Sequence, residues 1–220
     1  MSDDEPIEKP RPRPELATML ATEHWSLLGT RSMTWSEIMS RISIMLTVMS
    51  AFLVVLALFA QGVGFDRSIL PLAVGFSAAS LVIGTLTAVR VVLASQEDSQ
   101  LVRAMNRLRA AYVELAPEIQ PYLTASTRDD RDGLAATYTL GDRRSTFVHV
   151  IGSTAFFVFV INAMVAGTLG ALVATLMELG RTVTVIAGTG LGLCWFALQV
   201  AAVGRIFGRS FGDVRFPSDG

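Results

Sequence analysis

Four long apolar stretches alternate with two short polar turns and one long polar segment along the chain. We predict membrane spans at residues 42–60, 69–89, 147–177 and 182–207. About 20 apolar residues in a helix cross the ~30 Å hydrocarbon core of a bilayer, so each stretch is long enough to span it. The stretch at 147–177 exceeds a single crossing, so this helix has to tilt or to protrude.

The two short polar turns are of a length that joins neighbouring helices as antiparallel hairpins. We therefore expect an all-α fold, a membrane four-helix bundle made of two helical hairpins. The acidic, proline-rich residues 1–14 predict a disordered tail, and residues 208–220 form a second tail. Residues 15–41 form a lead-in to the first span, either a helix in the membrane interface with Trp25 at headgroup depth or a segment packed on the cytoplasmic loop.

The start of the first long helix is predicted from a capping pattern. Thr34 and Glu37 have the spacing of a capping box, in which each side chain accepts a hydrogen bond from the other residue's backbone N–H. We therefore expect this helix to begin at Thr34, with Arg41 at the cytoplasmic edge of the membrane.

The long polar segment at 95–146 contains one amphipathic pattern, which ends before Pro117. Its apolar residues recur at spacings of four, three, four and three, at Leu101, Met105, Leu108, Tyr112 and Leu115. We predict a cytoplasmic helix here that can continue the second span, and we expect residues 117–146 to be a loop. This helix is a candidate binding surface for a cytoplasmic protein partner.

The distribution of basic residues predicts the orientation in the membrane. Of the 18 Lys and Arg residues, only Arg67 and Arg181 lie on the side opposite to the tails and the long polar segment. Positively charged loops stay in the cytoplasm, so we expect both termini to be cytoplasmic in a plasma (inner) membrane. The net charge of −1 gives no basic field for a nucleic acid.

Polar residues within the spans are the first candidates for function, because lipid makes them costly. Asn162 lies near the middle of the third span and Gln199 in the cytoplasmic half of the fourth. They would face a pore or a substrate, or would form an interhelical hydrogen bond. His149, at the cytoplasmic start of the third span, is a candidate pH-sensitive residue or an ordinary interface residue.

Small residues recur four positions apart in three of the spans, a pattern that lets helices approach closely in lipid. The glycines in these rows are Gly84, Gly167, Gly170, Gly188 and Gly192. We expect them to pack the bundle itself or a subunit interface.

The sequence contains no recognised motif for catalysis or metal binding. Asp129, Asp130 and Asp132 hint at a calcium loop, but the other ligand positions of that motif are missing. The single cysteine, Cys194, excludes an intramolecular disulfide and disfavours a thiolate metal site. We therefore expect no enzymatic activity, no metal and no cofactor.

The stretch TEHWSLLGTRSMTWSEIMSRISIMLTVMSAFLVVLALFAQ, at residues 22–61, resembles the opening of small four-span membrane proteins of actinobacteria-type bacteria. The resemblance covers the first span and its lead-in. It implies a four-span topology and a structured lead-in containing Trp25, Arg31, Trp35, Glu37 and Arg41. It implies no reaction.

Two functions remain open. In the first, the protein is a non-enzymatic module that forms homo-oligomers, as a channel or pore-like assembly in the lipid bilayer. In the second, it is a membrane-anchored adaptor or sensor that acts through residues 95–146.

Overall fold

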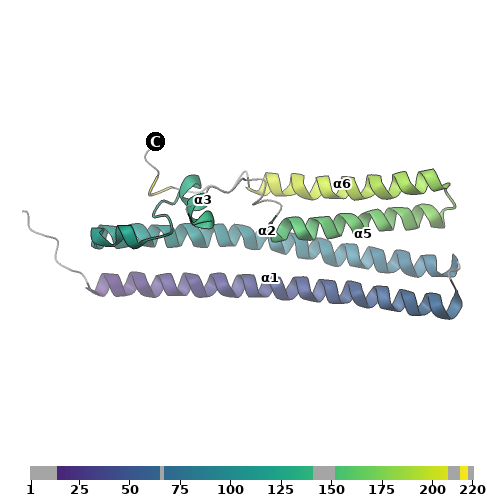
Figure 1. The fold of residues 1–220 in the computed structure, drawn as a ribbon, viewed down its shortest axis with the longest axis horizontal. Helices are drawn as coiled ribbons and strands as arrows, with labels where there is room; N and C mark the ends of the chain where they lie inside the picture. Colours follow the sequence, from purple (N-terminus) through teal and green to yellow (C-terminus); the bar gives the residue numbers. More distant parts are fainter. Residues whose placement is uncertain (1–13, 65–66, 141–151, 208–213, 218–220) are drawn as a thin grey trace, which may run out of the picture. The chain divides into compact units, whose positions relative to one another are not determined.

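The computed structural model describes residues 14–64, 67–140, 152–207 and 214–217, which are almost entirely helical and contain no strand (Figure 1). The chain divides into two compact units. One unit, here called the lobe, comprises the described residues of Met1–Ser32, Ser99–Arg143 and Asp213–Gly220. The other, here called the bundle, comprises those of Met33–Asp98 and Arg144–Gly212.

Helix α1 runs without interruption over Pro14–Val63, and the expectation that it begins at Thr34 is wrong. Pro14 suits a first helical position, because a backbone N–H at that position has no partner within the helix and proline lacks this N–H. Thr34 lies within the helix, so its backbone is not in the extended conformation that a capping residue needs. The helix ends before Gly64, which has φ of 85° and donates its N–H to the Ala60 carbonyl at 2.9 Å. Glycine adopts this left-handed conformation readily.

Helix α2 spans Leu70–Leu115 after a 3-10 turn, η1, at Arg67–Ile69. The predicted continuation of the second span into the amphipathic helix is thereby confirmed. Pro117 stops the helix because proline disfavours a helical conformation at the residue before it. The expectation of a loop over residues 117–146 is wrong in two stretches, since the 3-10 helix η2 occupies Pro117–Tyr122 and helix α3 occupies Arg131–Thr139. Residues 141–146 lie outside the described residues.

Helix α5 spans Thr154–Leu176, and α6 spans Arg181–Phe207. The Ser153 hydroxyl caps α5 by accepting from the Phe156 N–H at 3.2 Å. Helix α5 is 23 residues long, so its described part is closer to a single crossing than the hydropathy of 147–177 suggested. Residues 147–151 of that predicted span lie outside the described residues.

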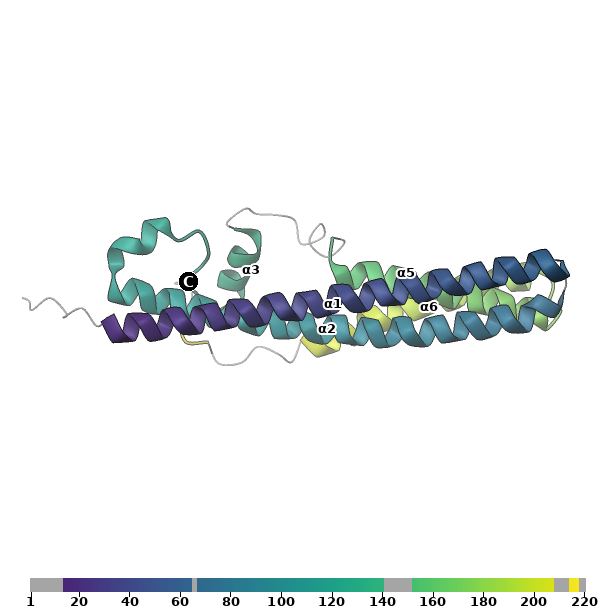
Figure 2. The same cartoon turned by 90° about the horizontal axis from the view of Figure 1, so that it is seen from below.

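Four helices, α1, α2, α5 and α6, are each long and apolar enough to cross a membrane, in agreement with the predicted number of spans. Within the bundle they run alongside one another, as both views show (Figures 1 and 2). Three of them supply the buried core residues, which are Ile38, Ile42, Met45, Ala88, Val91, Val92, Ala94, Val158 and Phe159. Many large apolar side chains point outward, among them Leu53, Leu86 and Leu193. An apolar outer surface suits helices that face lipid.

Candidate functional site

The two polar side chains predicted within the spans meet inside the bundle. The Asn162 Nδ2 of α5 donates a hydrogen bond to the Gln199 Oε1 of α6 at 3.0 Å. Asn162 is fully buried, and Gln199 is 8% exposed. The Gln199 Nε2 in turn donates to the Trp195 carbonyl of its own helix at 3.4 Å. The pair therefore links α5 to α6 as an interhelical hydrogen bond.

Gly84 of α2 packs directly against this pair. A Cβ added at Gly84 would overlap the Asn162 side-chain oxygen and would come within 3.5 Å of the Met49 terminal methyl of α1. Among the described residues, that Asn162 oxygen has no hydrogen-bond partner. The close approach of α2 to Asn162 thus depends on glycine at this position, which connects Gly84 to the polar pair.

The remaining predicted glycines lie in close contact between α5 and α6. A Cβ at Gly167 would lie 3.0 Å from the Gly188 carbonyl oxygen, and one at Gly192 would lie 2.9 Å from the Ala163 carbonyl oxygen. A Cβ at Gly170 would likewise lie 3.0 Å from the Ala187 carbonyl oxygen. A Cβ at these distances would crowd the backbone of the neighbouring helix, so the small residues let α5 and α6 of one chain pack closely.

A cluster of charged and aromatic side chains joins α1 to α2 beyond the predicted spans. Glu37 accepts from the Arg90 Nη2 at 3.0 Å and from the Arg41 Nε at 2.8 Å, and Arg90 also donates to Glu97 at 2.9 Å. The hydrogen bond from Arg90, reinforced by that from Arg41, lowers the pKa of Glu37 to about 2. Glu37 and Arg90 are both partly exposed, so the cluster positions the helices with a modest contribution to stability.

Another contact of the same region uses the indole of Trp35. Its Nε1 donates to the Asp98 carboxylate at 2.8 Å, and Asp98 is only 3% exposed. Trp35 therefore gives the buried Asp98 carboxylate a hydrogen-bond donor, and burial of a polar group without such a partner is costly.

Asp129 is the centre of the lobe and has no exposed surface. Its carboxylate accepts from the Arg107 Nε at 2.6 Å, from the Phe216 N–H at 2.8 Å and from the Arg215 N–H at 3.1 Å. Its own N–H donates to the Phe216 carbonyl at 3.1 Å. One side chain thus binds α2 and the C-terminal segment 214–217 at once.

Two opposing effects act on the pKa of Asp129. Burial raises the pKa, but the hydrogen bonds from the Arg215 and Phe216 N–H groups and from Arg107 outweigh it, so the pKa lies below its usual value. The carboxylate is therefore charged throughout the neutral range, which is the form that binds these donors.

Neighbouring residues of α2 hold the backbone that carries Asp129. The Arg103 Nε donates to the Asp129 carbonyl at 2.9 Å, and the Asn106 Nδ2 donates to the Arg128 carbonyl at 2.7 Å. Asn106 is fully buried and also accepts from the Thr137 hydroxyl of α3 at 3.0 Å. These contacts orient the carboxylate independently of the C-terminal segment.

The apolar face of the amphipathic helix is largely covered within the lobe. Met105 is 2% exposed, whereas Leu101 and Leu108 are half-buried and Leu115 is exposed. The Tyr112 hydroxyl donates to the Leu20 carbonyl of α1 at 3.0 Å. Four of the five predicted partner-binding residues therefore contribute to packing, and their role in partner binding stays a prediction.

The lead-in segment packs against the same helix through a histidine. The His24 ring stacks on Tyr112 with 5.9 Å between the ring centroids, whereas Trp25 points outward and is 74% exposed. Burial, with the nearby Arg109 cation, lowers the pKa of His24. Packing on the polar segment 95–146 is thus the alternative that the described part of the lead-in supports.

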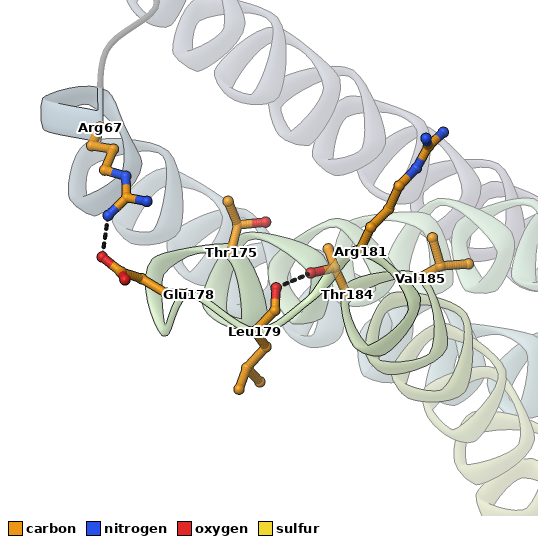
Figure 3. Close-up of a pocket in the computed structure, with 7 residues that line it drawn as sticks. All are labelled: Arg67, Thr175, Glu178, Leu179, Arg181, Thr184 and Val185. Carbon is orange, nitrogen blue, oxygen red and sulfur yellow. Dashed lines mark hydrogen bonds and ion pairs between the residues drawn. The ribbon is translucent and has the colours of Figure 1, made fainter.

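An open pocket lies at the turn between α5 and α6 (Figure 3). Its lining residues are Arg67, Thr175, Glu178, Leu179, Arg181, Thr184 and Val185. Arg67 forms an ion pair with Glu178, and the Thr184 hydroxyl donates to the Leu179 carbonyl at 3.4 Å. The Arg181 side chain points away from that ion pair. Because these polar groups are directed to each other or away, they do not converge on a ligand position.

His149, the predicted pH-sensitive residue, lies outside the described residues. Within the described part of the chain, no group of three His, Cys, Asp or Glu residues is placed to hold a metal ion. The role of Asp129 was missed from the sequence, where it appeared in a rejected calcium motif. Asp129 binds backbone groups that lie 86 and 87 residues later in the chain, and no local sequence pattern connects positions so far apart.

Comparison of the chain with protein-family models, with curated proteins and with solved structures gives no match.

Proposed function

We propose that the protein is a four-span membrane protein that acts as a membrane-anchored adaptor through its lobe, with both termini in the cytoplasm. The observation that carries this proposal is the network centred on Asp129, which joins α2, α3 and the segment 214–217 into one folded unit outside the predicted spans. A polar segment with a buried hydrogen-bond network has a defined surface, which a protein partner can recognise.

The exposed aromatic side chains of the lobe support the same function. Trp25 and Tyr122 are 74% and 84% exposed. Tryptophan and tyrosine contribute strongly to protein–protein interfaces when they are buried by a partner. Both residues lie outside the predicted spans. Burial in lipid therefore does not explain why the Tyr122 side chain is exposed.

The polar pair in the bundle gives less support to a pore. Asn162 and Gln199 are hydrogen-bonded to each other and buried between helices rather than directed to an open channel. A pair of this kind is sufficient for helix association in lipid. A channel formed by several copies of the chain therefore remains a weaker hypothesis than an adaptor.

The proposed orientation can be tested with single cysteines in a Cys194→Ser background. Tyr122→Cys reports the lobe, and Gly180→Cys reports the turn between α5 and α6, where an added Cβ meets no atom within 4 Å. A membrane-impermeant maleimide should label Tyr122→Cys only in inside-out vesicles and Gly180→Cys only in right-side-out vesicles. The reverse pattern would reject the cytoplasmic position of the lobe.

The adaptor function can be tested by photo-crosslinking in the native cell. A photoreactive amino acid at Tyr122 or Leu115 should give a discrete crosslinked protein, because both positions are exposed on the lobe. Matched positions on the outer surface of the spans, Leu53 and Leu193, should crosslink lipid instead. Self-crosslinks at Leu53 or Leu193, together with ion flux in liposomes, would favour the channel over the adaptor.

A further inference from the structure

We propose that Asp129 and its neighbours form an exchangeable binding site for a short bent peptide segment, with segment 214–217 of the same chain as its resident ligand. The proposal goes beyond the adaptor function and does not require it, because the site is defined by contacts within the lobe. The ligand class is a short peptide, bent at its centre, that directs two consecutive backbone N–H groups to one carboxylate.

The site recognises the backbone of its ligand. The Asp129 carboxylate accepts from the N–H groups of Arg215 and Phe216, and the Asp129 N–H donates to the Phe216 carbonyl. Recognition of a peptide through its main chain gives affinity with little dependence on side chains. Arg215 and Pro217 are exposed and Phe216 is half-buried, so Phe216 provides the main side-chain anchor.

Pro217 restricts the backbone of Phe216, the residue before it. The residue before a proline avoids the helical region and favours an extended backbone. Phe216 is therefore disposed to present its N–H and carbonyl to Asp129 without a helix competing for them. This local preference lowers the entropy that binding has to overcome.

The receptor side keeps its structure without the ligand. Arg107 pairs with the Asp129 carboxylate at 2.6 Å, Arg103 holds the Asp129 carbonyl, and Asn106 holds the Arg128 carbonyl. These residues belong to α2 and to the segment before α3, and none of them is part of the ligand. Departure of the C-terminal segment thus leaves the carboxylate still paired, which makes exchange possible without unfolding the lobe.

The resident segment belongs to the same chain as its site, so its binding is intramolecular. Intramolecular binding of this kind corresponds to an effective concentration on the order of 1 mM. If the intrinsic Kd is on the order of 0.1 mM, the attached segment competes with a free peptide by about tenfold. The site should therefore open to a second peptide when the resident segment is removed.

The experiment uses a fluorescent peptide with the sequence of residues 213–220 and the protein in lipid nanodiscs. A variant lacking residues 213–220 should bind the peptide saturably in fluorescence anisotropy, and the full chain should bind it about tenfold more weakly. The same affinity for both proteins, or no saturable binding to the shortened one, would overturn the proposal.

Backbone recognition is tested by changing only the peptide. An N-methyl group on Phe216 removes the donor that lies 2.8 Å from the Asp129 carboxylate, and it should weaken binding at least tenfold. An N-methyl group on Val214, whose N–H makes no hydrogen bond within the described residues, is the matched control and should change affinity by less than about twofold. Equal binding of the two methylated peptides would contradict recognition of the backbone by Asp129.

A second measurement keeps the protein intact. Hydrogen exchange of residues 215–216 in the full chain reports whether the resident segment is bound. Millimolar unlabelled peptide should speed this exchange by displacing the segment. Unchanged protection at saturating peptide would show a permanently fixed C-terminal segment and would reject an exchangeable site.

Discussion

Different interactions stabilise the interior of the bundle and the interior of the lobe, although α1 and α2 run through both. In the bundle, helices approach until the carbonyl of one lies against a glycine of the next, and one amide pair lies among them. In the lobe, a single buried carboxylate collects hydrogen bonds from segments far apart in the chain.

The difference fits the surroundings that we propose for each unit, lipid for the bundle and water for the lobe. Lipid is as apolar as a leucine side chain, so helices in a membrane gain little from burying leucine and depend on close packing. In water, apolar burial is favourable, but it is not directional. The lobe therefore needs a specific polar network, such as the one around Asp129, to select one arrangement.

Asp129→Asn should have the largest effect and should act on the lobe alone. It leaves the Arg107 guanidinium without its charged partner and weakens the contacts of Arg215 and Phe216. Breaking a fully buried ion pair costs about 3–5 kcal/mol, and since the Arg107 side chain is 33% exposed we expect about 2–3 kcal/mol. Hydrogen exchange of the lobe helices measures this loss of stability.

Asp132→Asn is the matched control for this substitution. Asp132 is exposed in the first turn of α3, so its neutralisation should cost less than about 0.5 kcal/mol. Equal losses in the two variants, or a loss of protection in the bundle helices, would contradict a local network centred on Asp129.

Acid should release segment 214–217 through the same carboxylate. The pKa of folded Asp129 lies below the usual value of about 3.9, so its stabilising contribution is complete above that value. The contribution is lost as the pH falls through the folded pKa, and it should be constant between pH 5 and 8. A dye on Val214→Cys in a Cys194→Ser background would follow the release.

The acid transition has a clear internal test. Asp129→Asn should remove it, because no proton binds at that position. Glu37 of the bundle, with a pKa of about 2, stays charged to lower pH than an ordinary glutamate. Persistence of the same transition in Asp129→Asn would assign the acid response to another group.

Gly84→Ala should affect the bundle and leave the lobe unchanged. The new methyl group overlaps the Asn162 side-chain oxygen, so either Asn162 turns away from Gln199 or α2 moves outward. Overpacking of this kind costs about 1–3 kcal/mol. Thermal unfolding in mild detergent measures the change.

Gly75→Ala provides a matched control on the same helix. An added Cβ at Gly75 meets no atom within 4 Å, so this substitution should be neutral or slightly stabilising. A similar loss for both alanine variants would indicate that α2 needs glycine for a reason other than its approach to Asn162.

The spans were predictable because hydropathy is a local property of the sequence. The fourth span was expected at 182–207, and α6 occupies Arg181–Phe207. The start of α1 was mispredicted because the Thr34 pattern is also compatible with the middle of a helix. Only the residues before it, which are themselves helical, distinguish the two cases.

The two polar residues inside the bundle could be predicted because polar side chains are conspicuous within apolar spans. Asn162 and Gln199 were identifiable as polar residues in apolar spans, and they prove to be partners. Asp129 was not identifiable, because charged residues are ordinary in a polar segment. Its partners lie 22, 86 and 87 residues away, and no periodicity connects such positions.

Asn162→Leu should have the smallest effect, although Asn162 is the most deeply buried polar residue of the spans. Interhelical hydrogen bonds in membrane proteins contribute about 0.6 kcal/mol on average, with a maximum near 1.7 kcal/mol. Leucine also removes the buried oxygen that has no partner among the described residues, which offsets part of the loss. A double-mutant cycle with Gln199→Leu, measured by thermal unfolding, isolates the contribution of the pair.

The result for Asn162 separates packing from conduction. If the pair only joins α5 to α6, the cycle should give a small coupling energy and every variant should keep the crosslinking pattern of the lobe. If Asn162→Leu instead abolished an ion flux in liposomes without a change in stability, the pair would line a pore. The bundle would then carry the function, and the lobe would be its regulator rather than the site of action.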